Sequence, residues 1–388
     1  MSDAPSSSAP SPASSSSTTP PVPDRPLDGR WFCDQSVFET ERRALFDGRW
    51  LCAGPVGDLR EVGDHFTRDL QSEPLLFSRW GERPDEICGV YNVCRHRGTR
   101  VVDHECGSGA KNFQCPYHAW TYRLDGSMFG APRMDENEGF DPDDAGLVSF
   151  PTAVWNGFLF FRLGTQGPTS PAEQFATLTD ITPWTAEPLV TAARKRYDVA
   201  ANWKVLCHNY GECYHCALVH PQLQDISHYL SGGEQHSSDC FVGGPMRLND
   251  GCNTMNMDGR TDRPNLGRVS GEDEQLVYFY NLYPNFLLSL HRDYLVSYVL
   301  WPVAPNRTII HCDWLFPPDL VAQSGFDISS EVEFWDLTNR QDWDICARTQ
   351  IGVASAGYRP VAYHDGEGCL AEFDRWYLSQ MEPALEEG

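Results

Sequence analysis

The chain has 388 residues and a formal net charge of −24, from 54 acidic and 30 basic side chains. This length is sufficient for two domains of ordinary size, each with its own core. The negative charge would repel nucleic-acid phosphates and anionic lipid surfaces, so it excludes a general polyanion-binding role.

Residues 1–26 are rich in Ser, Pro, Ala and Thr and lack hydrophobic periodicity. Such a segment cannot bury enough apolar surface to offset the entropy lost on ordering, so a disordered tail is predicted. No secretory signal is recognisable, and no run approaches the roughly 18 apolar residues of a membrane span. The expected location is the cytoplasm, where the 14 cysteines would stay reduced and serve metal binding or core packing.

Two groups of strands are predicted along the chain. Residues 39–50 are expected to form a short helix, and the short apolar runs from there to about Trp155 indicate a small antiparallel β domain. Aromatic and β-branched residues predict a second sheet, formed by residues 275–283, 286–291, 294–303 and 308–316. Helices are expected before and after this sheet. The Gly/Asp/Asn-rich residues 230–274 exceed an ordinary connection and predict a lid or mobile loop.

Two compact Cys/His pairs lie in the predicted small β domain. Cys94-Arg95-His96 is followed, after eighteen residues, by Cys115-Pro116-Tyr117-His118. Each pair fits the tip of one hairpin loop, so the two loops would clamp an iron-sulfur cluster with both thiolates on one iron and both imidazoles on the other. Imidazole ligands raise the potential of such a cluster. A structural zinc site is the alternative, although zinc sites more often group like ligands.

The residues around these pairs resemble the Rieske domain of the aromatic-ring-hydroxylating and quaternary-amine oxygenases. The similar stretches are residues 92–98 and 115–122, with Asp125-Gly126 just beyond. The resemblance implies a [2Fe-2S] Rieske cluster, with these ligands: Cys94, His96, Cys115 and His118.

Residues 202–221, NWKVLCHNYGECYHCALVHP, predict a second metal site. His215 and His220 are five residues apart, a spacing that does not place them on one face of a regular helix. Because Pro221 biases His220 away from the helical conformation, a helix ending near Val219 with His220 folded back is predicted. Two histidines and one carboxylate on one face of an octahedral iron leave positions open for dioxygen, as in non-haem oxygenases.

The missing carboxylate is expected from a helix near the C-terminus, which Ser330 and Glu333 would open as a capping box. Asp342 is the acid in the inward stripe of this helix, whereas Asp344 points to the opposite face. The other members of the stripe are Trp335, Ile345, Cys346, Thr349 and Val353. A buried carboxylate needs a partner, which would be a metal ion or else an arginine or backbone amides.

The family resemblance continues through this second group. The segments around residues 202–204, 212–215 and 220–221 match the family's iron-binding segment, and residues 339–343 match its carboxylate segment. The resemblance implies that His215, His220 and Asp342 hold Fe(II), and that Glu212 is the acid that bridges the two metal centres. Glu212 lies one helical turn before His215 and could accept the ring N–H of a cluster histidine, such as His118 of a neighbouring subunit.

Two further features of this segment allow alternatives. His208 stands where relatives often carry an acid, which would alter the proton inventory near the iron or be simple surface variation. Cys213 and Cys216 form a C-x-x-C pair, but without a βαβ context the packing of Cys207, Cys213 and Cys216 in the core is favoured over a thioredoxin-like dithiol.

The resemblance covers residues 27–381 and implies an α+β fold. It places a small antiparallel β Rieske domain at residues 46–155, and a helix-grip catalytic domain with an antiparallel sheet at residues 27–45 and 156–388. It also implies a homotrimer that receives electrons from NAD(P)H through a flavin/iron-sulfur reductase or a ferredoxin. A separate reductase is also required chemically, since no Gly-rich dinucleotide fingerprint occurs in a strand-to-helix context.

The expected function is the oxygenase component of a multicomponent system, which uses O2 to hydroxylate or oxidatively N-demethylate a small organic substrate. Residues 334–336, 339–343 and 373–377 look closer to the glycine betaine, stachydrine and choline oxygenases than to naphthalene-type dioxygenases. Aromatic faces would hold a trimethylammonium group by cation–π attraction. The alternatives are an aromatic-ring-hydroxylating dioxygenase, an electron-carrier Rieske protein without oxygenase activity, and a zinc-stabilised binding module.

Overall fold

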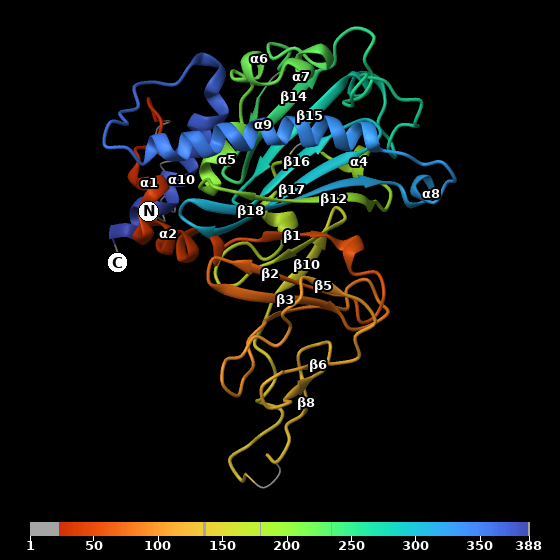
Figure 1. Cartoon of the computed structure of the whole chain (residues 1–388), viewed down its shortest axis with the longest axis vertical. Coiled ribbons are helices and arrows are strands. Elements are labelled where there is room, and N and C mark those ends of the chain that lie inside the picture. The colour runs from red at the N-terminus through yellow and green to blue at the C-terminus, as the bar shows by residue number, and fades with distance from the viewer. Residues whose placement is uncertain (1–22, 135–136, 179, 234, 387–388) are drawn as a thin grey trace, which may run out of the picture.

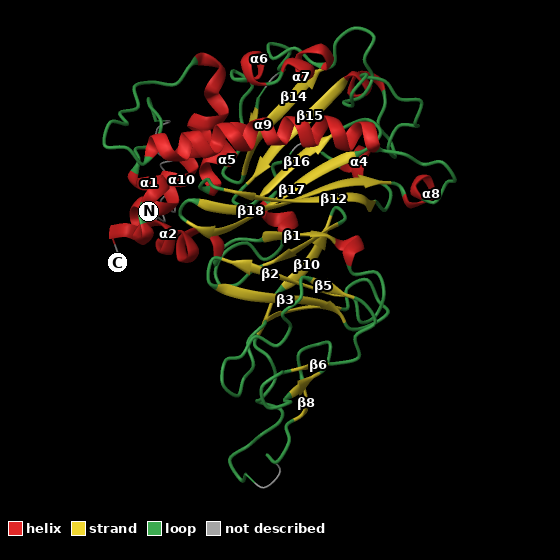
Figure 2. Ribbon diagram, viewed as in Figure 1, coloured by secondary structure: helices red, strands yellow, loops and turns green. Residues whose placement is uncertain are grey.

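A computed structural model describes residues 23–134, 137–178, 180–233 and 235–386. Of the predicted disordered tail, residues 1–26, the first 22 residues lie outside the described part of the chain. The described residues form a narrow lobe of small antiparallel sheets and a broad lobe built around a seven-stranded antiparallel sheet with helices (Figures 1 and 2). The α+β fold class is therefore confirmed. Among the described helices, none combines the length and hydropathy that crossing a membrane requires.

The narrow lobe contains three antiparallel sheets. In the first, β11 (Phe158–Phe161) is the central strand between β1 (Leu51–Pro55) and β10 (Thr152–Trp155). The second has the order β5-β2-β3-β4-β9, and its strands are β2 (His65–Leu70), β3 (Glu73–Arg79), β4 (Ile87–Tyr91), β5 (Cys106–Gly107) and β9 (Ser149–Phe150). The third has the order β6-β7-β8, and its strands are β6 (Phe113–Gln114), β7 (Thr121–Tyr122) and β8 (Met128–Gly130).

The seven-stranded sheet of the broad lobe has the order β12-β18-β17-β16-β15-β14-β13. Its strands are β12 (Val190–Val199), β13 (His236–Ser237), β14 (Phe241–Arg247), β15 (Leu276–Leu282), β16 (Phe286–Leu290), β17 (Leu295–Ala304) and β18 (Arg307–Phe316). The four strands predicted between residues 275 and 316 are thus confirmed to within two residues at each end, because continuous aromatic and β-branched runs favour buried strands.

Both faces of this sheet are covered. Helix α9 (Ser329–Val353) lies across one face (Figure 2), and on that side Tyr298 packs against Tyr210 of α5. On the other face Trp301 stacks on Phe161 of the narrow lobe. The remaining helical segments are α1 (Arg30–Cys33), α2 (Gln35–Glu41), η1 (Arg42–Phe46), η2 (Val56–Asp58), α3 (Pro171–Gln174), α4 (Thr182–Thr185), α5 (Trp203–Tyr210), α6 (Cys216–Val219), α7 (Pro221–Ile226), η3 (Gly271–Gln275), α8 (Pro318–Val321), η4 (Asp365–Glu367) and α10 (Gly368–Glu386).

The helix predicted at residues 39–50 is displaced towards the N-terminus. Helix α2 begins at Gln35, and the helical segment ends at Phe46. The Asp47 N–H closes the last turn on the Arg42 carbonyl at 2.8 Å, and the following Gly48 has a low helix propensity. Trp50 instead leads into β1, so the apolar residues after the turn belong to a strand.

The prediction that residues 230–274 form a loop is wrong for part of this region. Strand β14 lies inside it and pairs along its whole length with β15. Its Gly243-Gly244-Pro245 sequence resembles a turn, which explains the error. The strand requires Gly243 because a Cβ there would come within 2.0 Å of the Phe279 carbonyl oxygen. Pro245 lies beyond the β13 pairing at residues 242–243. On that side it meets only the isolated bridge between Gly232 and Met246, where its carbonyl accepts the Gly233 N–H at 2.8 Å, so its missing N–H interrupts no regular ladder.

The predicted capping box of α9 is also wrong. The helix begins at Ser329, and Ser330 lies inside its first turn, where its Oγ accepts the Met257 N–H at 3.1 Å. Asp327 supports the helix start instead, since its carboxylate accepts the Ser329 N–H at 2.9 Å. The inward stripe is confirmed only in part. Trp335, Cys346 and Val353 are buried, Asp342 and Ile345 are half-buried, and Thr349 is exposed, whereas Trp343 and Gln350 are buried instead.

Candidate metal centre and active-site cavity

The four residues predicted to bind a cluster lie on the two loops that follow β4 and β6. Cys94 and Cys115 are 4% and 2% exposed, whereas both histidines are exposed. The Nδ1 atoms of His96 and His118 lie 3.1 Å apart. Both imidazole rings could therefore offer their Nδ1 atom to the same iron. The His96 ring is held by stacking on Trp120 at 4.8 Å between centroids.

The two loops have the same backbone arrangement. The Gly98 N–H donates to the Cys94 carbonyl at 2.9 Å, and the Ala119 N–H donates to the Cys115 carbonyl at 3.1 Å. Gly98 and Ala119 both have positive φ, 77° and 58°, which glycine adopts freely but alanine only with strain. Strain of this kind is typical of ligand-holding turns, where the backbone conformation is needed to aim the ligands.

The geometry favours a two-iron cluster over a single zinc ion. One zinc ion would bring all four ligand atoms within about 4 Å of one another, given Zn–S and Zn–N bonds of about 2.3 and 2.1 Å. Among the described residues, the metal-binding side chains grouped within 4.8 Å of one another are His215, Cys216 and His220, and the four cluster residues form no such group. Buried cysteines on one side and paired exposed histidines on the other fit a cluster with a different ligand type on each iron.

Tyr122 provides a further contact to this centre. Its hydroxyl lies 3.2 Å from Cys94 Sγ and accepts the Arg95 N–H at 3.1 Å. Burial and the contact with Cys94 raise the pKa of Tyr122 above its usual range, so the hydroxyl keeps its proton and can donate it to a Cys94 thiolate.

Replacing Tyr122 by phenylalanine is expected to lower the reduction potential of the cluster by about 20–60 mV, because a hydrogen bond to a ligand sulfur is worth about 0.5–1.5 kcal/mol and stabilises the more negative, reduced form. Tyr117→Phe is the control, since the Tyr117 hydroxyl contacts only Arg97 among the described residues. Potentiometric titration of both variants measures the shift. Equal potentials in wild type and Tyr122→Phe would contradict the assignment.

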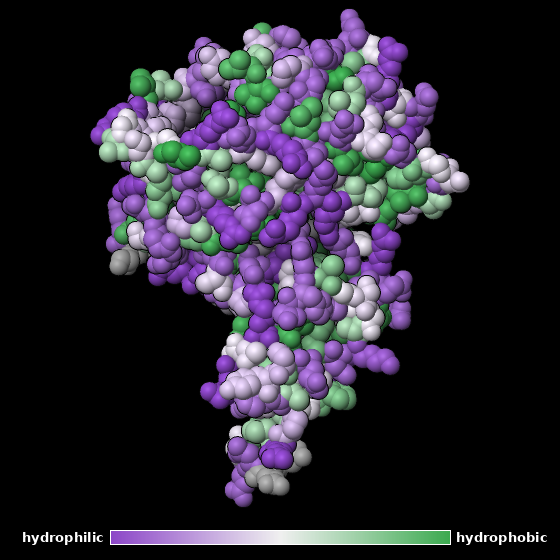
Figure 3. All heavy atoms as spheres, in the orientation of Figure 1, coloured by the Kyte–Doolittle hydropathy of each residue, from purple (hydrophilic) through white to green (hydrophobic). Residues whose placement is uncertain are grey.

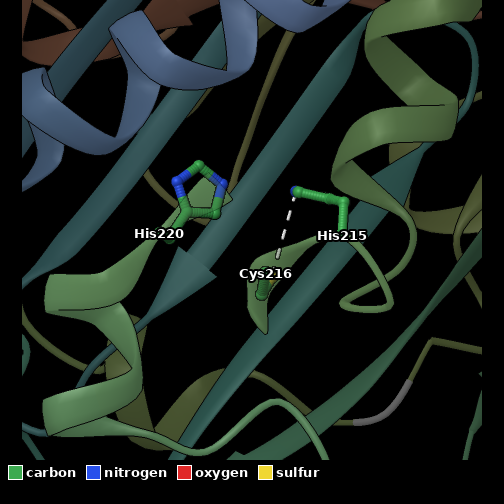
Figure 4. A group of neighbouring side chains, drawn as sticks. All are labelled: His215, Cys216 and His220. Atoms are coloured by element: carbon green, nitrogen blue, oxygen red, sulfur yellow. Dashed lines mark hydrogen bonds between the residues drawn. The ribbon is translucent and has the colours of Figure 1, made fainter. Parts of the chain in front are cut away.

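The second group of predicted ligands meets in the broad lobe. His215 is the residue before α6, and His220 lies between α6 and α7 with φ −123° and ψ 68°, so the predicted helix end at Val219 is confirmed. The two imidazoles come from these short segments and border a common space (Figure 4). Asp342 on α9 completes the group, with its Oδ1 2.9 Å from His220 Nε2 and 3.2 Å from His215 Nε2.

These distances suit a metal ion. Adjacent ligand atoms around an octahedral ion are about 3 Å apart when each bond is about 2.1 Å. Burial lowers the pKa of His215, but hydrogen bonds to Asp342 and Glu212 outweigh burial and raise it to about 10. Burial raises the pKa of Asp342, but its contacts with the two histidines outweigh this and hold it below the usual range. The group therefore stabilises a positive charge at the point where a metal ion would supply one.

Three further polar side chains orient this group, and sequence reasoning missed them. Gln341 Oε1 lies 2.8 Å from His220 Nδ1 and also accepts the Gln222 amide at 2.8 Å. Asn209 Nδ2 donates to Asp342 Oδ1 at 3.1 Å. Their only signal in the sequence is their position: Gln341 directly precedes Asp342, and Gln222 and Asn209 lie near the two histidines.

Glu212 contacts His215 rather than a cluster residue of the same chain. Its Oε1 is 2.5 Å from His215 Nδ1, and its Oε2 accepts the His215 backbone N–H at 3.2 Å. Glu212 and Gln341 thus each accept an Nδ1–H, which leaves both Nε2 lone pairs directed towards Asp342. Fixing the tautomer of a histidine ligand in this way is the usual role of such partners.

The cysteines of this segment have different environments. Cys207 is 1% exposed, as expected of a packing residue. Cys216 is also buried in the hydrophobic core and Cys213 packs against that core, as predicted, and both also line the cavity described below as free thiols. Cys216 Sγ lies 3.9 Å from His215 Nε2 (Figure 4). A hydrogen bond with Cys213 and burial raise the pKa of Cys216, so Cys216 is a neutral neighbour and a poorer ligand than Asp342.

His208 is paired with an acid from a distant helix. Its Nε2 lies 2.6 Å from Asp374 Oδ1 on α10, and Asp374 also accepts the Leu27 N–H at 3.3 Å. Asp374 is fully buried. His208 therefore ties α5 to α10, and it is not simple surface variation.

A cavity of about 550 Å³ opens beside the histidine pair and Asp342. Its walls come from the segment 209–223, strands β14 and β15, helix α9 and the segment 364–369. The aromatic side chains in its lining are Tyr210, Tyr214, Tyr229, Phe279 and Trp335. On the face of the molecule drawn in Figure 3, hydrophilic and hydrophobic side chains are interspersed.

Comparison with known proteins agrees with this arrangement. The family model of the ring-hydroxylating alpha subunit catalytic domain matches residues 187–383, and that of the Rieske [2Fe-2S] domain matches residues 49–151. The glycine betaine monooxygenase oxygenase subunit of Chromohalobacter salexigens is 30% identical over 396 residues, which cover 94% of this chain and 87% of the relative. The chain belongs to the Rieske non-haem iron oxygenase family.

Two further comparisons extend this assignment. The carnitine monooxygenase oxygenase subunit of Acinetobacter baumannii is 29% identical over 340 residues, or 85% of each chain. The crystal structure of the quaternary ammonium Rieske monooxygenase CntA with L-carnitine matches with a TM-score of 0.75, covers 92% of this chain and 95% of that chain, and is 22% identical. At this identity the structural match supports the fold.

As a Rieske oxygenase, this protein is an enzyme whose cofactors are a [2Fe-2S] cluster and a mononuclear iron. The residues present fit both groups by the geometry described above. The match to the catalytic domain counts against two alternatives, an electron-carrier Rieske protein and a zinc-stabilised binding module. Neither of these proteins would need a second metal site.

Proposed function

We propose that this Rieske oxygenase uses O2 and electrons from NAD(P)H, delivered by a flavin/iron-sulfur reductase or a ferredoxin, to hydroxylate or oxidatively N-demethylate a quaternary ammonium compound. The observation that carries the proposal is the opening of His215, His220 and Asp342 onto a cavity with aromatic walls. Aromatic faces attract quaternary ammonium groups. Relatives at 29–30% identity are named for glycine betaine and carnitine.

In this proposal each metal group has its own ligands. Cys94, His96, Cys115 and His118 hold the cluster, while the iron is held by His215, His220 and Asp342. When bound, these groups supply single electrons and the activation of dioxygen. The surrounding side chains hold protons in place: the carboxylate of Glu212 and the amide of Gln341 keep the two Nδ1–H groups, so that both Nε2 atoms stay free for the metal.

We also propose that the active assembly is a homotrimer in which a neighbouring chain supplies the cluster. In Figure 1, α6 and α7 lie at the opposite end of the long axis from β6 and β8, so the two sites of one chain are separated by the length of both lobes. Inter-subunit electron transfer is described for a structurally similar quaternary ammonium Rieske monooxygenase. Sedimentation velocity of the purified protein measures the assembly directly.

We propose domain boundaries that keep each sheet within one domain, which the strand pairing supports. A Rieske domain of residues 46–155 would leave β11 in the catalytic domain, although β11 is the central strand between β1 and β10. An end after Phe161 keeps this sheet whole. Residues 27–45 then join the catalytic domain from residue 162 onwards, because Glu41 of α2 bonds to Trp203 of α5 and Tyr377 of α10.

The proposed function is tested with purified holoenzyme and a reductase. Betaines, carnitine, choline and simple arenes are supplied in turn, and NAD(P)H oxidation, formaldehyde release and hydroxylated products are measured. Turnover of a methylated ammonium compound with no arene product is the expected result. Product from arenes alone would overturn the proposal in favour of an aromatic-ring-hydroxylating dioxygenase.

Glu212→Gln is expected to slow turnover by about 10–100-fold, the usual cost of mutating the partner of a metal-binding histidine. The variant keeps an acceptor for His215 Nδ1 but removes the charge. Both metal groups should remain, since none of their ligands is changed. The rate at which reduced clusters are reoxidised in a single turnover, measured together with iron content, checks this prediction. Wild-type rates with full iron content would show that the Glu212 charge has no role.

A further inference from the structure

Two histidines of the narrow lobe, outside both metal groups described above, face each other. His65 lies on β2, and His104 lies on the segment that connects the two cluster loops. Their Nε2 atoms are 2.9 Å apart, the separation expected of adjacent ligands around one ion when each bond is about 2.1 Å. His65 is 6% exposed, whereas the side chain of His104 is 56% exposed, so the pair lies at the surface of the lobe.

The other nitrogen of each ring lies beside an acceptor oxygen. His65 Nδ1 is 3.0 Å from the Gly63 carbonyl oxygen, which can only accept a hydrogen bond. His104 Nδ1 is 3.6 Å from Asp103 Oδ1. Both oxygens favour the tautomer that carries its proton on Nδ1, so the two Nε2 lone pairs face each other. Backbone carbonyls and carboxylates are the usual partners of metal-binding histidines for this reason.

A direct hydrogen bond between the two rings is the alternative, and it conflicts with these acceptors. It needs a proton on one Nε2, and in a neutral imidazole that proton leaves Nδ1 with a lone pair. The lone pair would then face the Gly63 carbonyl or the Asp103 carboxylate. A doubly protonated ring removes the conflict only where imidazole is charged, below about pH 6.5. A metal ion between the Nε2 atoms leaves both Nδ1–H groups with their partners.

Neighbouring residues hold the pair and keep the space beside it open. Gly107 of β5 is the cross-strand partner of His65. A Cβ at Gly107 would lie 2.9 Å from His65 Nε2 and 3.3 Å from His104 Nε2, so the glycine keeps a side chain away from both nitrogens. The His104 carbonyl accepts the Thr67 hydroxyl at 2.9 Å, which holds the connecting segment against β2. Both backbones are therefore fixed, as a preorganised site requires.

The pair is linked to the cluster loops in two ways. His65 packs edge-to-face on Phe113, with 5.2 Å between ring centroids, and Phe113 begins β6, two residues before Cys115. His104 belongs to the eighteen residues that separate His96 from Cys115. An ion bound by both histidines would therefore tie this connection to β2, next to the strand that leads to Cys115.

We propose that His65 and His104 form a third metal site, which binds a divalent ion such as Zn²⁺ through both Nε2 atoms and clamps the connection between the cluster loops. Imidazole nitrogen suits zinc, nickel and copper. Two protein ligands leave the other positions of the ion to water. The role of this ion is structural, because both histidines lie in the narrow lobe while the cavity lies in the broad lobe. The site does not depend on the proposed substrate.

The experiment measures zinc binding by holoenzyme. Wild type and His104→Ala, both with cluster and mononuclear iron in place, are dialysed against Zn²⁺ at about pH 8, where free imidazole is uncharged. Zinc and iron are then determined together, so that zinc replacing iron is recognised. Wild type should bind zinc at least about a hundredfold more tightly than the variant, since losing only the partner of a ligand already costs about 10–100-fold. His104 is exposed, so the variant should fold.

Two further variants test the geometry. Asp103→Asn should weaken zinc binding by about tenfold, because the charged partner of His104 is lost. Cys106→Ser should leave zinc binding unchanged. Cys106 pairs with Phe66 while Gly107 pairs with His65, and successive residues of a strand point to opposite faces. Loss of zinc from Cys106→Ser instead of His104→Ala would assign the ion to a thiol and overturn the histidine site.

A second measurement tests the clamp. Zinc at about ten times its Kd should raise the temperature at which half of the cluster absorbance is lost by about 3 °C or more in wild type, because the ion binds only the folded lobe. The same concentration should not shift this temperature in His104→Ala. Zinc that binds without the shift would overturn the clamp. Equal zinc binding by wild type and His104→Ala would overturn the site itself.

Discussion

Replacing Asp342 by alanine is expected to abolish turnover and to remove the mononuclear iron while leaving the cluster spectrum intact. The variant deletes the only carboxylate within hydrogen-bond distance of both His215 Nε2 and His220 Nε2 among the described residues. Loss of a partner of a metal ligand already costs about 10–100-fold in affinity or activity. Loss of the ligand itself should therefore exceed about a hundredfold.

The measurement combines metal analysis with visible spectroscopy. Iron should fall from about three to about two per chain, because the [2Fe-2S] cluster keeps its own two irons. Asp344→Ala is the matched control, since Asp344 lies on the same helix, is 59% exposed and pairs only with Arg348 among the described residues. An Asp342→Ala enzyme with full activity and full iron content would refute the site.

Replacing Lys204 by methionine is expected to destabilise the broad lobe by about 3–5 kcal/mol. Lys204 Nζ pairs with Glu41 Oε1, and both side chains are completely buried. The same carboxylate accepts Trp203 Nε1–H at 2.9 Å and the Tyr377 hydroxyl at 2.7 Å. Removing the ammonium group leaves a buried carboxylate without its counter-charge. The free-energy cost of that unpaired charge is larger than the net stabilisation that the intact pair provides.

Urea unfolding followed by tryptophan fluorescence measures this loss. Lys204→Met combined with Glu41→Gln should recover part of the stability, because the amide carries no charge to leave unpaired. Arg348→Ala is the control and should cost less than about 0.5 kcal/mol, since its ion pair with Asp344 is exposed. A loss below about 1 kcal/mol for Lys204→Met would show that the pair contributes little.

This pair also affects the iron site indirectly. Helix α5 carries Lys204 in its first turn and ends at Tyr210, next to Glu212 and the segment with His215. A loosened α5 would shift Asn209, which donates to Asp342. Lys204→Met enzyme that still folds should therefore bind iron more weakly than wild type, whereas Arg348→Ala should not.

The segments that carry most of the candidate ligands could be predicted, because their local conformations depend on a few neighbouring residues. Cys94 and His96 lie within one turn closed by Gly98, and the Pro221 that follows His220 limits its backbone whatever the rest of the chain does. The strands between residues 275 and 316 were also predictable, since aromatic and β-branched runs favour buried strands in many contexts. The charge of −24 likewise needs no structure to be interpreted.

Other features depend on which distant segment covers a residue. Gln341 and Gln222 are hydrogen-bonded although they lie 119 residues apart in the sequence, and Glu41 and Lys204 are paired although they lie 163 residues apart. No local sequence pattern identifies such partners. Strand β14 carries a turn-like sequence but is a strand because β15 lies against Gly243.

The sequence by itself determined the two candidate ligand motifs, the strands between residues 275 and 316 and the type of chemistry, because these follow from residue type and short-range spacing. Only the tertiary structure decided the start of α9, the partner of His208 and the buried pair of Lys204 and Glu41. Hydrogen bonding and burial of a polar group depend on neighbours that folding brings together, and the free energy of a buried charge or amide is set by those neighbours.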